Sequence, residues 1–150
     1  MTEANQHSNN SGNVTIFFCR QIDPDQDVNR RHLEKELGSR IKFFPLPCSG
    51  RIEALHFLKA LEAGARKVYL IACPDGACRY GQGNLRARKR LDYARKLIAE
   101  IGLSGDRLEI VTAPRTLPVS IDAVARQILT LTPANAGFTG SVETAKTAVR

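Results

Sequence analysis

The chain contains four short stretches that are almost continuously apolar, and each is bounded by polar or turn-forming residues. That pattern predicts β-strands buried between layers of helix. The predicted strands cover residues 14–18, 41–46, 67–72 and 108–112. The third reads Lys-Val-Tyr-Leu-Ile-Ala and is nearly uniformly apolar, so we expect it at the centre of a sheet.

Apolar residues recur at intervals of three and four elsewhere in the chain, which predicts amphipathic helices. Helices are expected from Asp27 to Leu37, after a cap at Ser49, after a cap at Asn84, and from Ile121 onward. The residues expected to face the core are Ile52, Leu55, Leu58 and Leu61 in the second helix, Leu91, Ala94, Leu97, Ile98 and Ile101 in the third, and Ile121, Val124, Ile128 and Leu131 in the fourth, which Pro133 ends.

Strand and helix therefore alternate four times, which is typical of an α/β fold. We predict a small doubly wound, flavodoxin-like parallel sheet of four strands in the order 2-1-3-4, with helices on both faces to give three layers. One domain is expected over residues 13–132. The Asn- and Ser-rich residues 1–12 are expected to be a disordered lead, and the small, polar residues 133–150 a C-terminal tail.

The composition is that of a globular protein, with 43% hydrophobic and 25% charged residues among 150. No apolar stretch is long enough to cross a membrane, and the polar N-terminus lacks the apolar core of a signal peptide. We therefore expect a cytoplasmic protein, whose thiols stay reduced. Metal binding or redox chemistry then explains clustered cysteines better than structural disulfides do.

Basic residues outnumber acidic ones by 22 to 15, which gives a net charge of +7. A basic balance can indicate nucleic-acid binding. Aromatic residues make up only 6% of the chain, however, and there is no Trp and no recognisable nucleic-acid-reading motif. Nucleic acid is therefore not an expected partner, and the charge would equally suit an acidic protein surface or an anionic cofactor. The Arg- and Lys-rich third helix is most simply a solvated face, or else a docking surface.

The positions of the four cysteines carry the most chemical information. Cys19, Cys48 and Cys73 stand at or just beyond the C-terminal ends of three predicted strands. In a parallel sheet those ends lie along one edge, where such folds bind their ligands. Cys78 follows Cys73 in a loop whose Asp75-Gly76 pair favours a turn back toward the same point. Four thiols would then meet, and four thiolates enclose an all-sulfur metal centre.

A [2Fe–2S] cluster suits ligands distributed in this way, because each of its two irons needs two thiolates. The Cys-x4-Cys spacing of Cys73 and Cys78 is also one that plant-type ferredoxins use. Three arginines, Arg20, Arg51 and Arg79, each lie within three residues of a cysteine. Positive charge stabilises an anionic cluster. We predict the four cysteines as metal ligands and the three arginines as cofactor-binding residues.

Other interpretations of the thiols stay open. A structural Zn²⁺ also accepts four thiolates, although its usual pattern has two close cysteine pairs and this chain has one. Each thiol could instead be a small buried hydrophobe. A redox-active dithiol is less favoured because Cys-x-x-Cys is absent. No nucleophile, base and orienting group are clustered in the sequence, so catalysis by this chain alone is not expected.

Two blocks of the sequence resemble the delta subunit of methyl-viologen-reducing hydrogenase. Residues 47–52 read Pro-Cys-Ser-Gly-Arg-Ile, and residues 73–84 read Cys-Pro-Asp-Gly-Ala-Cys-Arg-Tyr-Gly-Gln-Gly-Asn. The segment Arg86-x-Arg88-Lys89-Arg90-Leu91 continues the resemblance, which covers roughly residues 13–131.

The resemblance implies a non-catalytic electron-transfer subunit that carries one [2Fe–2S] cluster in a large oxidoreductase complex of anaerobic metabolism. Its implied partners are a heterodisulfide-reductase-A-like flavoprotein, with FAD and iron–sulfur centres, and another oxidoreductase subunit. Cys48, Cys73 and Cys78 match family ligands, and Cys19 matches the first cysteine of a family Cys-x-x-Cys. The second position of that pair is Ile22 here, so a complete ligand set requires all four thiols. The alternative is a structural docking subunit whose site holds zinc or nothing.

Overall fold

The computed structural model describes residues 13–74, 81–114 and 120–130. Its centre is a sheet of four strands, β1 (Val14–Cys19), β2 (Ile41–Leu46), β3 (Lys67–Ala72) and β4 (Leu108–Thr112). All three neighbouring pairs are parallel, and the strand order is β2-β1-β3-β4. The predicted strands, their order and their direction are confirmed.

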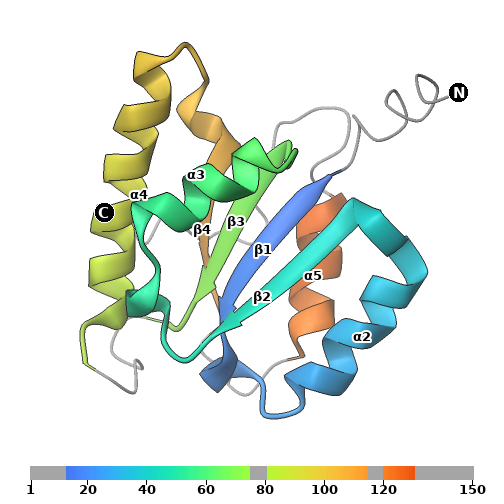
Figure 1. Cartoon of the computed structure of the whole chain (residues 1–150). Helices are drawn as coiled ribbons and strands as arrows, with labels where there is room; N and C mark the ends of the chain where they lie inside the picture. The colour runs from blue at the N-terminus through green and yellow to red at the C-terminus, as the bar shows by residue number, and fades with distance from the viewer. Residues whose placement is uncertain (1–12, 75–80, 115–119, 131–150) are drawn as a thin grey trace, which may run out of the picture.

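Helices cover both faces of this sheet, which confirms the three-layer α/β fold (Figure 1). On one face lie α2 (Gln26–Leu37) and α5 (Ile121–Thr130), and on the other lie α3 (Ala54–Glu62) and α4 (Gly83–Glu100). None of these helices combines the length and the apolar content that crossing a membrane requires.

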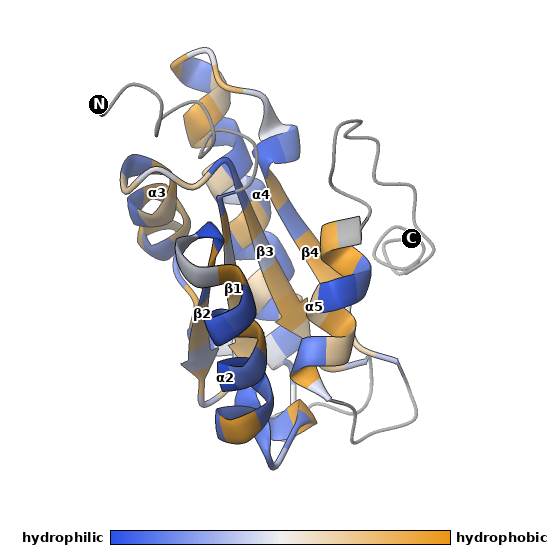
Figure 2. Ribbon diagram, turned by 90° about the vertical axis from the view of Figure 1, so that its right-hand side faces the viewer, coloured by the Kyte–Doolittle hydropathy of each residue, from blue (hydrophilic) through white to orange (hydrophobic). Residues whose placement is uncertain are grey.

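The strands supply two separate layers of core because successive side chains point to opposite faces. In β3, Tyr69 and Ile71 pack with the α2 and α5 side chains, whereas Val68, Leu70 and Ala72 pack with those of α3 and α4. All five are fully buried. Figure 2 shows mostly hydrophobic residues in the central strands and a mixture of hydrophobic and hydrophilic residues in the helices, as expected of amphipathic helices that cover a sheet.

The starts of α3 and α4 differ from those that the sequence predicts. Ser49 does not cap α3, because Ser49–Arg51 forms a separate 3-10 turn. The helix starts at Ala54, where Glu53 and His56 form a reciprocal capping box. Of the four predicted core residues, Ile52 is buried ahead of the helix, and Leu58 and Leu61 are partly buried against the core. The prediction for Leu55 is wrong, because this residue is 57% exposed and the buried residues of α3 are Phe57 and Ala60.

In α4 the predicted cap Asn84 lies inside the first turn, and Gln82 precedes the helix. The prediction that Ile101 is a core residue is wrong, because the helix ends at Glu100 and Ile101 is 73% exposed. The prediction of α2 is correct to within one residue. Leu131, Pro133 and the two predicted terminal segments lie outside the described residues.

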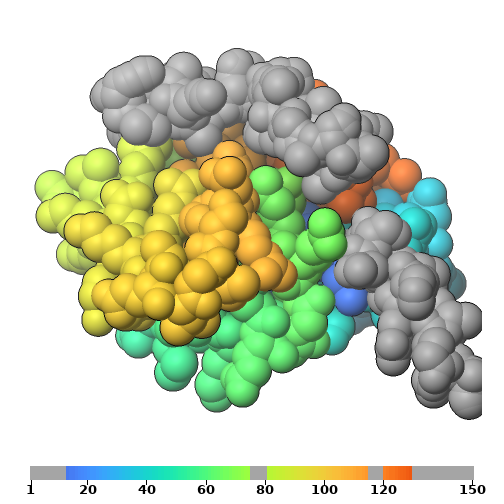
Figure 3. Space-filling view, turned by 90° about the horizontal axis from the view of Figure 1, so that it is seen from above, coloured from blue at the N-terminus to red at the C-terminus, as the bar shows by residue number. Residues whose placement is uncertain are grey.

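The edge of the sheet opposite the cysteines is closed by short connections. Figure 3 looks down on this edge, where the segment that follows α4 lies beside the segment that follows α3. Arg107 joins the two, because its guanidinium donates to the carbonyls of Arg66 (3.1 Å) and Ala65 (3.3 Å).

The edge strand β2 is only partly covered by α3. A cavity of about 440 Å³ opens between them, and Phe17, Phe44 and His56 line it together with Lys42 and Lys59. The rings of Phe17 and Phe44 stack with centroids 5.4 Å apart, and Phe44 is 45% exposed.

Candidate metal centre

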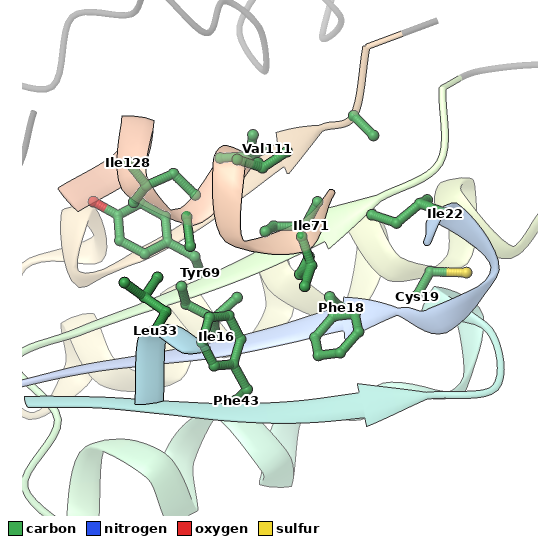
Figure 4. Close-up of a cluster of buried hydrophobic side chains, with 14 of the residues drawn as sticks. Ile16, Phe18, Cys19, Ile22, Leu33, Phe43, Tyr69, Ile71, Val111 and Ile128 are labelled. Atoms are coloured by element: carbon green, nitrogen blue, oxygen red, sulfur yellow. The ribbon is translucent and has the colours of Figure 1, made fainter. Parts of the chain in front are cut away.

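Two of the predicted ligands meet at the carboxyl edge of the sheet. Cys19 is the last residue of β1, and Cys73 follows the last residue of the neighbouring strand β3. Their sulfur atoms are 3.7 Å apart, and both residues are 2% exposed. Figure 4 shows Cys19 at the end of the buried row formed by Ile16 and Phe18, beside Ile22.

The distance between these sulfurs matches that of two ligands on one ion. In a tetrahedral site with metal–sulfur bonds of about 2.3 Å, two thiolates lie roughly 3.8 Å apart. Iron–sulfur clusters and zinc both use tetrahedral sulfur coordination. The Cys19–Cys73 pair therefore fits half of a four-thiolate centre without rearrangement of the strands that carry it.

The surroundings of Cys19 favour its thiolate, which is the form that binds metal. Its pKa is lowered from 9.0 to about 6, chiefly because the Cys73 thiol donates a hydrogen bond to it. Burial opposes this shift, while the backbone at Gln21 and Ser49 and the charge of Arg20 add to it.

Cys48 occupies the next strand end along the same edge. It lies in the connection after β2 and is 7% exposed, and its sulfur accepts a hydrogen bond from the Gly50 amide (3.3 Å). The following residue, Ser49, is the one whose backbone contacts the Cys19 sulfur. Within residues 13–74, 81–114 and 120–130, no three His, Cys, Asp or Glu side chains are close enough to share an ion. Cys78 lies outside these ranges, so the set of four ligands stays a prediction.

The connection that carries Cys48 is held against the start of α4 by a close backbone approach. A Cβ atom added to Gly50 would lie 2.7 Å from the Gly83 Cα. Real Cβ atoms do not approach backbone so closely, so any side chain at Gly50 would push the two segments apart.

Arg90 fixes the same connection by hydrogen bonds. Its guanidinium donates to the Gly50 carbonyl at 2.7 Å and to the Ile52 carbonyl at 2.9 Å. Asn84 joins the start of α4 to the end of β3, because its side-chain amide donates a hydrogen bond to the Cys73 carbonyl (3.4 Å). The start of α4 thus contacts both the connection that carries Cys48 and the backbone of Cys73.

Ser49 contributes a buried hydroxyl at this position. The residue is 1% exposed, and its Oγ has no hydrogen-bond partner among the described residues. A buried polar atom in this state calls for an explanation, such as a bound ion or group that the hydroxyl contacts. Together with the thiol pair, it fits a site built to hold an anionic sulfur-bound group.

The three predicted arginines have different positions. Arg20 is exposed directly after Cys19 and contributes to its lowered pKa. Arg51 is exposed in the 3-10 turn after Cys48. Arg79 lies outside the described residues, and a cofactor-binding role for the three stays a prediction.

Several residues of the site were not recognised from the sequence as part of it. The sequence predicts Ser49 and Asn84 as helix caps and places Arg90 on a solvated or docking face of the third helix. The sequence does contain a signal for the two glycines, because Gly50 and Gly83 lie in the two blocks, residues 47–52 and 73–84, that resemble the hydrogenase delta subunit. Their contact joins segments 33 residues apart (83 minus 50), and spacing alone does not predict such a contact.

The fold and this edge define an α/β domain in which two buried thiols, Cys19 and Cys73, meet with their sulfurs 3.7 Å apart. The family model of the methyl-viologen-reducing hydrogenase delta subunit matches residues 14–130. The chain belongs to this family.

Several curated proteins are similar to this chain, and most of those described below are named as iron-sulfur subunits of a hydrogenase. The vhu iron-sulfur subunit of the F420-non-reducing hydrogenase from Methanocaldococcus jannaschii is 34% identical over 70 residues, which are 47% of this chain and 52% of the relative. A protein of the same name from Methanococcus maripaludis is 27% identical over 97 residues, covering 65% of this chain and 72% of the relative. The A component of the ferredoxin:CoB-CoM heterodisulfide reductase from Methanosarcina mazei is 39% identical over 70 residues, or 47% of this chain and 9% of the relative. The chain thus spans about half the length of the first of these relatives.

Proposed function

We propose that this protein is an electron-transfer subunit that carries one [2Fe–2S] cluster at the carboxyl edge of its sheet. The observation that carries the proposal is the Cys19–Cys73 pair, whose 3.7 Å separation suits two thiolates on one iron. Relatives named as iron-sulfur subunits support this choice of metal. Residues 13–132 form the domain that bears the cluster.

The four thiols divide into two pairs in this proposal. Cys19 and Cys73 bind one iron, and Cys48 and Cys78 bind the other. The lowered pKa of Cys19 favours the deprotonated ligand at neutral pH. Arg20, Arg51 and Arg79 offset the negative charge of four thiolates, and the bound cluster accepts and releases one electron at a time.

The names of the relatives, rather than the geometry of the site, support our proposal for the electron route. We propose that the protein passes electrons between a heterodisulfide-reductase-A-like flavoprotein and a second oxidoreductase subunit, within a cytoplasmic complex. The match to part of a heterodisulfide reductase protein supports that partnership. The chain itself is not proposed to catalyse a reaction.

Iron and acid-labile sulfide in anaerobically purified protein test the cofactor. The expected result is about two irons and two sulfides per chain, with visible charge-transfer absorption. Colourless protein that contains one zinc and no sulfide would instead establish the structural alternative, since the same thiol pair also suits zinc.

Cys73→Ser separates the two functions in the assembled complex. An electron carrier should lose electron transfer while its assembly survives. A structural zinc subunit should lose folding or assembly, because structural zinc sites supply folding free energy.

A further inference from the structure

Helix α4 has a row of exposed residues along its outer side. Arg86, Lys89, Tyr93 and Lys96 follow one another at intervals of 3, 4 and 3, so they lie on one face of the helix. All four are exposed, and Tyr93 is 57% exposed. We call these four residues the outer row of α4.

The other cations of α4 are used by the fold itself. Arg90 holds the Gly50 and Ile52 carbonyls, and Arg95 donates twice to the Leu108 carbonyl (2.7 and 3.1 Å). Arg88 donates to the Thr112 hydroxyl at 3.5 Å. By contrast, Arg86, Lys89 and Lys96 have no hydrogen-bond or ion-pair partner in the part of the chain that the structure describes. Their charge is therefore available to another molecule.

Both acidic residues of α4 lie near this row, since Asp92 is three residues after Lys89 and Glu100 is four residues after Lys96. Asp92 is exposed, and a carboxylate oxygen lies 3.9 Å from a guanidinium nitrogen of Arg95, which already faces β4. Glu100 is the last residue of the helix, four positions beyond Lys96. The three cations of the row still outnumber the two carboxylates of α4, so the row keeps an excess of positive charge.

The row begins at the cysteine edge. The first turn of α4 contacts Gly50 through Gly83 and the Cys73 carbonyl through Asn84, and Arg86 follows two residues later. From Arg86 to Lys96 the row extends about 15 Å, at roughly 1.5 Å per residue. A protein bound along it would lie over the start of α4, next to the thiols.

We propose that the outer row of α4 is the docking surface for an acidic face of a partner protein. Arg and Tyr, together with Trp, are enriched among the residues that dominate binding at protein interfaces. Leu85, which is 45% exposed in the first turn, adds apolar area beside the cations. The exposed apolar side chain of Leu85 has nothing to contact on a row of phosphates, whereas a protein face supplies both carboxylates and apolar groups. This inference rests on the proposed function, because the row matters for electron transfer only if a cluster is bound at the cysteines near the start of α4.

The test compares two charge reversals that change the net charge equally. Arg86→Glu/Lys89→Glu alters the outer row, and Lys42→Glu/Lys59→Glu alters the two lysines of the cavity between α3 and β2. The probe is a purified heterodisulfide-reductase-A-like flavoprotein, titrated with each full-length variant at low salt. We expect the outer-row variant to bind at least about tenfold more weakly and the cavity variant within about threefold of the unaltered chain, with wild-type binding weakening as salt rises.

Equal loss in both variants, loss only in the cavity variant, or no wild-type binding at low salt would overturn the proposal. Tighter binding of the wild-type chain to a DNA or RNA duplex than to the flavoprotein would overturn it as well. Iron and sulfide content, measured on the same samples, reports separately on the proposed function.

A different observation concerns Ser49. Its hydroxyl is buried without a partner among the described residues, and its backbone contacts the Cys19 sulfur. We infer that this hydroxyl donates a hydrogen bond to a sulfur of the bound cluster and raises its reduction potential, since such bonds stabilise the reduced form.

Redox titration of Ser49→Ala and Ser49→Thr tests this role. The Ala variant should keep its two irons and titrate at a more negative potential, and the Thr variant, which retains a hydroxyl, should stay close to the unaltered chain. An unchanged potential in Ser49→Ala would refute the inference while leaving the cluster intact. Absence of a cluster in the unaltered chain would instead refute the proposed function.

Discussion

The carboxyl edge of the sheet positions its cysteines in two different ways. Cys19 and Cys73 are placed by the sheet itself, because Cys19 ends β1, Cys73 directly follows the paired strand β3, and their sulfurs are 3.7 Å apart. Cys48 is placed by a connection whose position depends on α4, through the Gly50–Gly83 contact and the two hydrogen bonds from Arg90. The Cys19–Cys73 pair therefore depends on strand pairing, whereas the position of Cys48 depends on the packing of α4 against the connection after β2.

The largest expected effect comes from removing a thiol of the pair that the strands place. Cys73→Ser should lower the iron content of the purified protein by about tenfold or more, because a ligand is lost outright and even outer-shell changes cost roughly 10–100-fold in affinity. The fold should survive, since both strands keep their apolar faces. Iron analysis together with circular dichroism checks both points. Full iron content in this variant would mean that the pair does not bind metal.

The second prediction addresses the placement of Cys48. In Gly50→Ala the new Cβ meets the Gly83 backbone, which has no flexible side chain to move aside. We expect a loss of about 1–3 kcal/mol in the free energy of unfolding, together with reduced iron content. Gly105→Ala is the matched control, because its Cβ would meet only the Arg95 side chain at 3.6 Å or more. Equal effects in a denaturant titration would show that the close approach is unimportant.

The third prediction concerns pH and the thiol pair. The pKa of Cys19 is about 6 in the folded chain and 9.0 ordinarily, so between these values the unfolded chain binds more protons. The resulting stabilisation is present above pH 9 and is lost as the pH falls through 6. Cluster-free, reduced protein should therefore gain stability from about pH 6 to about pH 9, and Cys19→Ser should gain less. An equal gain in the two proteins would show that Cys19 does not form a low-pKa thiolate.

The last prediction concerns Arg90, which holds the Cys48 connection from α4. Arg90→Met keeps the aliphatic stem but loses two charge-assisted hydrogen bonds, which should cost about 1–3 kcal/mol and loosen the Cys48 connection. In cluster-free protein, iodoacetamide should then modify Cys48 faster, with little change at Cys19 or Cys73. Arg86→Met, at an exposed position of the same helix, should change none of the three rates. Mass spectrometry of the modified peptides would reveal whether all three thiols respond together, which would contradict two separate modes of placement.

The same contrast explains what the sequence could predict. The apolar runs determine the four strands, and alternation with helices determines a parallel sheet, so the meeting of Cys19 and Cys73 follows from local patterns. The contacts around Cys48 do not, because Gly50–Gly83 and Gly50–Arg90 join residues far apart in the chain. Leu55 shows a further limit: its apolar character and spacing predict a core position, but the buried residues of α3 are Phe57 and Ala60, and Leu55 is 57% exposed.

The most direct test of the account is an electron paramagnetic resonance spectrum of the anaerobically purified, dithionite-reduced protein. A [2Fe–2S] cluster reduced by one electron gives a spin-one-half signal, and we expect close to one spin per chain, absent from Cys73→Ser. A reduced sample that contains stoichiometric zinc and shows no such signal would contradict an electron-transfer role for the thiols at this edge.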